Sequence, residues 1–345
     1  MKNRLRKLRA SGTPGFPAST RKIIYVWIFA LWLLPLNCAI AADWTPDKNV
    51  ELVVGVTPGG PSDTTARLLQ KVLQDRRILP VSVSVLNRPG GNNAIAWNYV
   101  NQHPGDGHFL GMTLPNLITN RLTGSHELNH TDLTLLAQLN SESIVFSVKA
   151  NSPVKSGIDM LQRLKLDPSG LTIAFSNIGS ANHIAASLVI KGAGFDIKKV
   201  KFVIFKGASE SVTAVLGGHV DAIASSASSV ATHVQSGALR LVAVASPQRL
   251  RKHPTVPTWK ELGVAASFAN WRGIAGPKGM NAAQIAFWDD VIGKVVRTED
   301  WIRSVEELGW EPDYMNSADS RRFLERQNEE LKDLLAELGL AKGIR

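Results

Sequence analysis

The sequence contains only one cysteine, Cys38, which lies near the amino terminus. It has neither a G-x-S-x-G nucleophile elbow nor a phosphate-binding P-loop, and no G-x-G-x-x-G follows its first predicted strand. RGG repeats, zinc-finger spacings and basic-helix signatures are also missing. One cysteine excludes an internal disulfide framework. Because the nucleophile elbow, the P-loop and the nucleic-acid-binding motifs are absent, no catalytic residue, cofactor or nucleic-acid partner is predicted.

Residues 1–41 have the layout of a secretory signal peptide. Seven basic residues and no acidic residue lie ahead of an apolar run at residues 23–34, and Ala39-Ile40-Ala41 offers small residues for cleavage. A membrane anchor of ~20 apolar residues is the alternative. Pro35 and Asn37 interrupt the run, which favours cleavage near Ala41 and a periplasmic location.

Removal of this segment changes the chemistry of the chain. The full sequence has a formal charge of +10, and loss of the seven basic residues leaves +3. Most of the basic character therefore belongs to the leader. Cys38 would leave with it, and Asn37 is not the small residue that lipid attachment would need before the cysteine. Of 345 residues 304 remain, which suggests two domains of ~150 residues each.

Short apolar runs alternate with helical patterns along the mature chain, which predicts an α/β fold with parallel sheets and right-handed crossovers. In the first block, strands are predicted at residues 50–56, 81–86 and 109–114, and helices at 62–74 and 94–100. In the second block, strands are predicted at 144–148, 171–175, 201–205, 222–224 and 239–245, and helices at 158–166, 181–193, 209–216 and 230–236. Three further helices are predicted at 282–297, 299–308 and 317–338.

Two extended, apolar-rich stretches separate the blocks, at residues 144–151 and 268–275. They are the predicted crossings between two lobes. The first lobe would comprise residues 43–145 and 272–345, and the second lobe residues 146–271.

A glycine-containing turn follows the first predicted strand. It consists of Thr57-Pro58-Gly59-Gly60, and the helix that comes next starts with Ser62 and Asp63 after Pro61. Such a turn exposes backbone N–H groups beside a helix N-terminus, and both features favour an anion. An ordinary turn between strand and helix, with Ser62 or Asp63 as the helix cap, is the alternative.

Small, polar and basic residues follow three strands of the second block. Hydroxyl, amide and backbone N–H groups there can hydrogen-bond a carboxylate, and Lys206 can supply a cation unless its side chain extends into solvent. The candidates are Ser176, Asn177, Gly179, Ser180, Lys206, Gly207, Ala208 and Ser225. Together with the first turn they form the predicted ligand-binding site.

Three histidines are also considered. His183 lies one turn into a predicted helix without a nucleophile partner, so it is interpreted as a structural hydrogen-bonding residue. His126 and His130 lie four residues apart with Asp132 nearby, but the stretch is loop-like and has no second group of ligands. No metal site is predicted.

Six motifs in order resemble those of the Bug-type receptors, the solute-binding subunits of tripartite tricarboxylate transporters. The resemblance spans essentially the whole mature chain. The matching segments are residues 58–67 (PGGPSDTTAR), 87–91 with 104–110 (NRPGG and PGDGHFL), 179–183 (GSANH), 205–207 through 216–221 (FKG and LGGHVD), 256–263 (VPTWKELG) and 271–277 (WRGIAGP). This sequence departs from the family motifs at Asn92-Asn93, at Asn177, where a glycine is usual, and at Phe175, where a serine is usual.

The resemblance implies a type II periplasmic-binding-protein fold, in which two α/β lobes are joined by a two-strand hinge. It implies a receptor without enzymatic activity that captures a small carboxylate, such as a di- or tricarboxylate, an amino acid or an aromatic acid. One carboxylate would be held near the Pro58-Gly59-Gly60 turn, with the second-lobe residues closing over the rest. Ligand contacts to both lobes would favour the closed state. The expected partners are the membrane permease subunits of a tripartite transporter or, alternatively, a two-component sensor kinase. A monomer is expected.

Overall fold

The computed structural model describes residues 44–205 and 207–342. The predicted signal peptide and Lys206 lie outside the described residues. Among the residues described, no helix is both long and apolar enough to cross a membrane. The described chain forms two five-stranded sheets flanked by helices.

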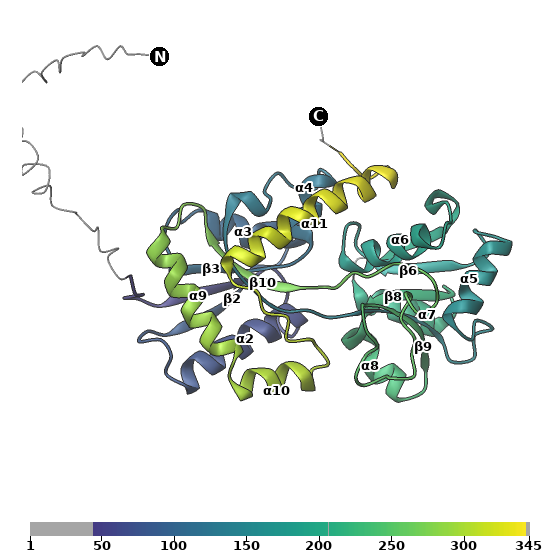
Figure 1. Cartoon of the computed structure of the whole chain (residues 1–345), viewed down its shortest axis with the longest axis horizontal. Helices are drawn as coiled ribbons and strands as arrows, with labels where there is room; N and C mark the ends of the chain where they lie inside the picture. Colours follow the sequence, from purple (N-terminus) through teal and green to yellow (C-terminus); the bar gives the residue numbers. More distant parts are fainter. Residues whose placement is uncertain (1–43, 206, 343–345) are drawn as a thin grey trace, which may run out of the picture. The chain divides into compact units, whose positions relative to one another are not determined.

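The first sheet has the strand order β2-β1-β3-β10-β4. Its strands are β1 (Val50–Val54), β2 (Val83–Asn87), β3 (Phe109–Thr113), β4 (Leu133–Asn140) and β10 (Arg272–Pro277). The accompanying helices are α2 (Pro61–Asp75), α3 (Ala94–Asn101), α4 (Asn116–Leu122), α9 (Ala282–Val296), α10 (Glu299–Glu307) and α11 (Ser317–Glu337), with short helices η1 (Gly91–Asn93) and η2 (His130–Asp132). In Figure 1, α11 lies beside α4, and α9 and α10 lie beside α2. We call this sheet with its helices the first lobe.

The second sheet has the strand order β7-β6-β8-β5-β9. Its strands are β5 (Ile144–Lys149), β6 (Thr172–Ser176), β7 (Lys201–Phe205), β8 (Ala222–Ser226) and β9 (Leu239–Ala245). The accompanying helices are α5 (Gly157–Leu166), α6 (Ala181–Gly192), α7 (Ala208–Gly217) and α8 (Ala227–Gln235), with the short helix η3 (Ile197–Lys199). We call this sheet with its helices the second lobe.

The predicted parallel pairing is present among β1, β2 and β3 and among β6, β7 and β8, but two strands depart from it. β10 runs antiparallel to β3 and β4, and β5 runs antiparallel to β8 and β9. Both strands come directly from the other lobe, without the crossover helix that a parallel connection needs. A strand that enters at the edge where the parallel strands end must run in the opposite direction.

The first crossing lies before the predicted stretch 144–151, because Ile144–Lys149 is strand β5 of the second sheet. Residues 141–143 connect β4 to β5, and residues 268–271 lead into β10. Glu142 and Asn270 exchange two backbone hydrogen bonds, with N···O distances of 3.2 and 2.9 Å. The two crossing segments therefore form a short antiparallel ribbon, the two-strand hinge.

The sequence analysis also missed β4 and α4. Gln138 and Asn140 interrupt the apolar pattern of β4, although both side chains are buried. The Gln138 amide lies 2.6 Å from a carboxylate oxygen of Asp313, which is far along the chain. Buried polar residues with such distant partners cannot be recognised from strand periodicity alone.

One apolar cluster reaches through both lobes. It includes Leu117 of α4 and Leu334 of α11 from the first lobe, and Phe146 of β5 and Ile184 of α6 from the second. Each of these side chains is at most 2 % exposed. The hinge is therefore accompanied by shared core packing on the side of α4 and α6.

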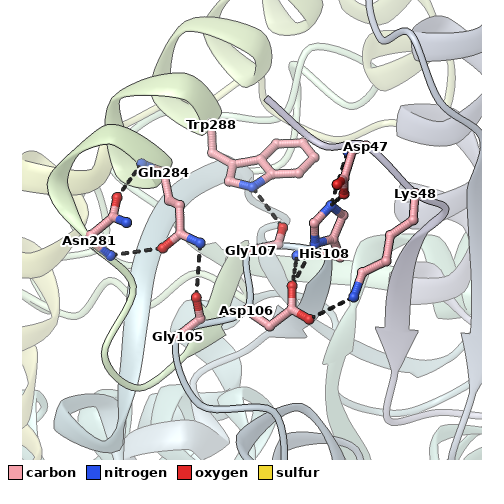
Figure 2. A network of polar contacts seen from close by, with 9 residues as sticks. All are labelled: Asp47, Lys48, Gly105, Asp106, Gly107, His108, Asn281, Gln284 and Trp288. Carbon is pink, nitrogen blue, oxygen red and sulfur yellow. Dashed lines mark hydrogen bonds and ion pairs between the residues drawn. The ribbon is translucent and has the colours of Figure 1, made fainter. Parts of the chain in front are cut away.

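The segment at residues 104–108 ties the start of the described chain to the first lobe (Figure 2). The buried His108 lies between two carboxylates: its Nδ1 is 2.6 Å from Asp106 and its Nε2 is 3.1 Å from Asp47. Lys48 Nζ lies 3.0 Å from the other carboxylate oxygen of Asp106. These contacts fix residues 47 and 48 against the loop before β3.

The same loop also contacts α9 (Figure 2). Gln284 Nε2 donates to the carbonyl oxygen of Gly105 at 2.9 Å, and Trp288 Nε1 donates to that of Gly107 at 3.0 Å. A Cβ on Gly107 would lie 2.8 Å from the Trp44 ring, so only glycine fits there. This motif of the resemblance therefore has a structural role.

The first prediction concerns Asp106. Burial works to raise the pKa of Asp106, but hydrogen bonds from His108 and Lys48 outweigh it and lower the pKa to about 2. A carboxylate with a depressed folded-state pKa adds stability above its unfolded pKa and loses it as the pH falls toward the folded value. Since the side chain is 30 % exposed, we expect a contribution of about 1 kcal/mol after solvent screening.

Urea unfolding of the wild type and Asp106→Asn measures this contribution. The wild type should have the larger free energy of unfolding above about pH 4, and the difference should narrow toward about pH 2. A difference that stays constant over this range would contradict the assignment.

Candidate functional site

The predicted binding turns lie at the carboxyl edges of the two sheets. In the first sheet, Gly273 near the start of β10 pairs with Thr113 at the end of β3. In the second, Ile144 at the start of β5 pairs with Ser226 at the end of β8. Both crossing segments thus meet their sheets where the parallel strands end. The carboxyl edges of both sheets therefore adjoin the same short hinge, and these edges are where open α/β sheets bind ligands.

The two lobes touch directly beside the hinge. Thr119 Oγ1 of α4 donates a hydrogen bond of 2.7 Å to the carbonyl oxygen of Gly179, in the turn between β6 and α6. A Cβ on Gly179 would lie 3.0 Å from the same hydroxyl, and its φ is +73°. This position needs glycine both for its backbone conformation and for the close approach of α4.

Asp63 holds the first glycine turn in place. Its side chain is 2 % exposed, and its oxygens accept hydrogen bonds from Gly59 N–H, Arg67 Nε and Asn87 Nδ2, each at 2.9 Å. Burial works to raise the pKa of Asp63, but these hydrogen bonds outweigh it and the pKa is lowered. The carboxylate therefore stays charged and already occupies the amide of Gly59.

Other amides of this turn remain open. α2 starts after Gly60, which has no side chain to cap the helix. The N–H groups of Ser62 and Asp63 have no hydrogen-bond partner among the described residues. Thr57, Pro58 and Gly59 are exposed and Gly60 is half-buried, whereas the Ser62 side chain is buried. An anion at this end of α2 would meet two free amides and the positive end of the helix dipole.

The turn after β6 is held by internal contacts. Ser180 caps α6 by accepting from the N–H of His183 at 3.3 Å and donates to the carbonyl oxygen of Ser176. The His183 ring accepts the N–H of Gly179 at 3.0 Å and stacks on Phe175 with a centroid distance of 4.5 Å. Burial lowers the pKa of His183 to about 4, so the ring is neutral and serves as a structural acceptor.

The asparagines that depart from the family motifs take left-handed backbone conformations. Asn92, Asn93 and Asn177 have φ values of 54°, 75° and 53°. Asparagine is, after glycine, among the residues that best tolerate this region. The side chain of Asn92 also bonds Asn120 of α4 at 2.6 Å. The departures therefore keep a glycine-like backbone and add polar contacts to it.

Two buried polar atoms at the edge of the second sheet have no partner in the described part of the chain. They are Oγ of Ser225, a side chain with 0 % exposure, and Oδ1 of Asn182, whose amide nitrogen donates to Ser176 Oγ at 3.0 Å. Buried polar groups are rarely left unpaired. These atoms mark the edge near β6 and β8 as a place where a polar ligand or water is needed.

The third group of predicted residues lies after β7. Gly207 is the N-cap of α7, and this helix has no side-chain cap. Ala208 begins α7 and is half-buried. Lys206 lies outside the described residues, so its predicted role as a cation stays a prediction.

Sequence reasoning missed a fully buried ion pair at the hinge. Arg272, the first residue of β10, pairs with Glu142 of the crossing segment, and both side chains have 0 % exposure. Arg272 also donates to Asn140 Oδ1 at 3.2 Å and lies over the Trp310 ring, 4.4 Å from its centroid. The signal in the sequence was Arg272 inside the apolar stretch 268–275 and Glu142 two residues before the stretch 144–151.

Glu142 also reaches the second lobe. Its other carboxylate oxygen accepts the backbone N–H of Ser228, in the first turn of α8, at 2.7 Å. An internal carboxylate thus occupies the N-terminus of α8. The ion pair joins β10 of the first lobe, the hinge and α8 of the second lobe in one network.

Residues 126–130 spell H-E-L-N-H, the spacing of a helical zinc motif. The segment is not helical before η2, which begins at His130. His126 contacts Asn98 at 3.1 Å, and burial lowers the pKa of His130. Within the described residues no group of three potential metal ligands comes together, so the motif lacks the geometry that zinc requires.

Two mixed α/β sheets, a two-strand hinge and helix N-termini at adjoining edges define a two-lobed solute-binding protein. A family model described as the tripartite tricarboxylate transporter family receptor, TctC, matches residues 65–340. The chain belongs to this family of periplasmic solute-binding receptors.

Individual relatives agree with this assignment. The protein BugT of Bordetella pertussis is 25% identical over 325 residues, which is 93% of this chain and 98% of that protein. A TctC solute-binding protein from Polaromonas, solved without ligand, is 27% identical with a TM-score of 0.70 and covers 85% of this chain and 99% of its own. A protein of R. palustris solved with adipate is 25% identical with a TM-score of 0.75 and covers 87% and 99%. The predicted fold and the resemblance to Bug-type receptors are confirmed.

The second prediction concerns the buried ion pair. Arg272→Met leaves the Glu142 carboxylate buried without its countercharge, and we expect the free energy of unfolding to drop by about 3–5 kcal/mol. In the double variant with Glu142→Leu the unpaired charge is gone, so much of the loss should be recovered. Urea unfolding of the wild type, both single variants and the double variant gives the coupling energy. Additive single effects would show that the pair does not act as a unit.

Proposed function

We propose that the chain captures a small carboxylate between its two lobes and delivers it to the permease subunits of a tripartite transporter. The observation that carries this proposal is the pair of uncapped helices at adjoining edges, α2 in the first lobe and α7 in the second. Free amides at helix N-termini form charge-assisted hydrogen bonds with carboxylates.

The charges near the first turn support recognition by amides rather than by a basic side chain. Arg67 is engaged by Asp63 and Asn87, and Asp63 uses the Gly59 amide. A ligand carboxylate would therefore bind the amides of Ser62 and Asp63. The unpaired hydroxyl of Ser225 and the amides at the start of α7 would hold its other end.

Dicarboxylates are the first ligands to test. The R. palustris relative was solved with adipate, which carries a carboxylate at each end. A molecule of this kind suits two separated sets of amides, one on each lobe. Contacts to both lobes would stabilise the closed arrangement of the hinge. The chain would act in the periplasm as a monomer, after cleavage of its leader near Ala41.

The third prediction tests the site with a thermal-shift screen of adipate, succinate, citrate, glutamate and benzoate. A ligand at about one hundred times its Kd adds about 2.7 kcal/mol to the stability of the folded state. For a chain of this size that corresponds to an increase in Tm of about 5 °C. We expect at least one dicarboxylate to produce such a shift in the wild type.

Gly60→Trp should abolish the shift, because its side chain would cover the start of α2. The backbone at Gly60 has φ −73°, and a Cβ there would lie 3.4 Å from Val56, so a side chain is tolerated. Gly60→Ala is the matched control and should keep most of the shift. Equal shifts in the wild type and Gly60→Trp would mean that the carboxylate binds elsewhere.

A further inference from the structure

A cavity of about 610 Å³ adjoins the hinge and is lined by both lobes and both crossing segments. Ser141, Ser143, Ala269 and Trp271 contribute from the crossing segments, and the other lining residues come from residues 246–251, 267–268, 311–313 and from α11. The volume lies in the range of small-molecule sites. None of the residues predicted to bind the carboxylate lines this cavity. It is therefore distinct from the proposed carboxylate site.

Three aromatic residues line the cavity. Trp271 and Phe268 are 1 % and 7 % exposed, and Phe323 of α11 is half-buried. The rings of Trp271 and Phe323 meet edge to face, with centroids 6.0 Å apart. Such walls suit a flat apolar group of the size of one aromatic ring.

The charges in the cavity favour a cation. Both arginines that line it are engaged: Arg249 pairs with Glu261 at 2.9 Å, and Arg251 pairs with Glu306. Asp313 and Glu330 also line the cavity, and neither has an ion-pair partner among the described residues. Unpaired carboxylates beside aromatic faces attract an ammonium group.

Asp313 is half-buried, whereas Glu330 is exposed. It accepts hydrogen bonds from Gln138 at 2.6 Å and from Ser141. Burial raises the pKa of Asp313 above its ordinary value, which is the response of a carboxylate that lacks a cation.

A polar side chain independently points to a ligand. Gln327 of α11 is 8 % exposed, and its carbonyl oxygen accepts the Trp271 indole N–H at 2.7 Å. Its amide nitrogen has no partner among the described residues, and the residue lines the cavity. A ligand with a hydroxyl or carbonyl oxygen would supply the missing acceptor.

We propose that this cavity binds a small aromatic amine, whose ammonium group contacts Asp313 and whose ring packs against Phe268 and Phe323. The site does not depend on the proposed carboxylate function. Its preference for a cation is opposite to that of the carboxylate site. The two sites can therefore be told apart by the charge of the probe.

The fourth prediction uses tyramine as the probe, with 3-(4-hydroxyphenyl)propionate as the matched acid. Both have a hydroxyphenyl ring on a short chain, and only the charged end differs. Isothermal titration calorimetry should show saturable binding of tyramine to the wild type. Asp313→Asn should weaken it by about tenfold or more, because a hydrogen bond to a charged group is lost. Glu329→Gln, an exposed neighbour on α11 that does not line the cavity, is the control and should leave binding unchanged.

Two further variants keep the test valid if Asp313→Asn does not fold. Glu330→Gln removes an exposed carboxylate, and Phe323→Ala removes one half-buried wall. Each should also weaken tyramine binding. Absence of saturable tyramine binding, equal loss in Glu329→Gln, or equal heats from the matched acid in the same cavity would overturn the inference.

The carboxylate site supplies the remaining control. Gly60→Trp should leave tyramine binding intact, and Asp313→Asn should leave any dicarboxylate-induced shift in Tm intact. Loss of tyramine binding in Gly60→Trp would place the amine in the carboxylate site and overturn this inference alone. A carboxylate shift that is lost in Asp313→Asn but kept in Gly60→Trp would instead overturn the proposed carboxylate site.

Discussion

The hinge depends on one buried charge pair. Arg272 and Glu142 are both completely buried, and removing either partner would leave an uncompensated charge where the strands of both sheets meet the crossing segments. Asn140, the Trp310 ring and the Ser228 amide make further contacts with the two groups, and Arg272 Nε has no hydrogen-bond partner among the described residues. Any movement of the lobes must keep this network or exchange its partners. The pair therefore restricts the hinge to a few discrete arrangements, because a half-broken network in a buried environment is costly.

Several backbone N–H groups that an anion could use are likewise occupied by acceptors of the chain itself. Asp63 occupies the Gly59 amide, Glu142 occupies the start of α8, and the His183 ring occupies the Gly179 amide. Side chains of the protein thus accept hydrogen bonds from several of the backbone N–H groups at its glycine turns and helix N-termini. The N-termini of α2 and α7 have no side-chain cap. Internal acceptors rigidify the turns, and a rigid turn holds its free amides in place before the ligand arrives.

Much of this fold could be predicted from the sequence, because the strands of the parallel core are nearly continuous apolar runs and its helices are amphipathic. The strand Val50–Val54 and the helix Ala282–Val296 are examples. What could not be predicted are the features set by contacts between distant residues. Gln138 and Asn140 are buried in a strand, where Asp313 and Arg272 hydrogen-bond their side chains. The glycine turns were recognisable as candidates for the binding site. That Asp63 and His183 accept hydrogen bonds from amides of these turns depends on the three-dimensional course of the backbone. The hinge cavity has no local signature, since its walls come from five separate segments.

The position of the cavity has a mechanical consequence. It is bounded by residues of both lobes and by both crossing segments, so a change in the angle between the lobes must change its shape. A molecule held there would bind one lobe arrangement more tightly than another, and would thereby alter the affinity for a ligand that also distinguishes these arrangements. By thermodynamic linkage the effect would be mutual and of equal size in both directions. Two sites of opposite charge preference on one hinge would thus make carboxylate capture depend on the amines present in the same compartment.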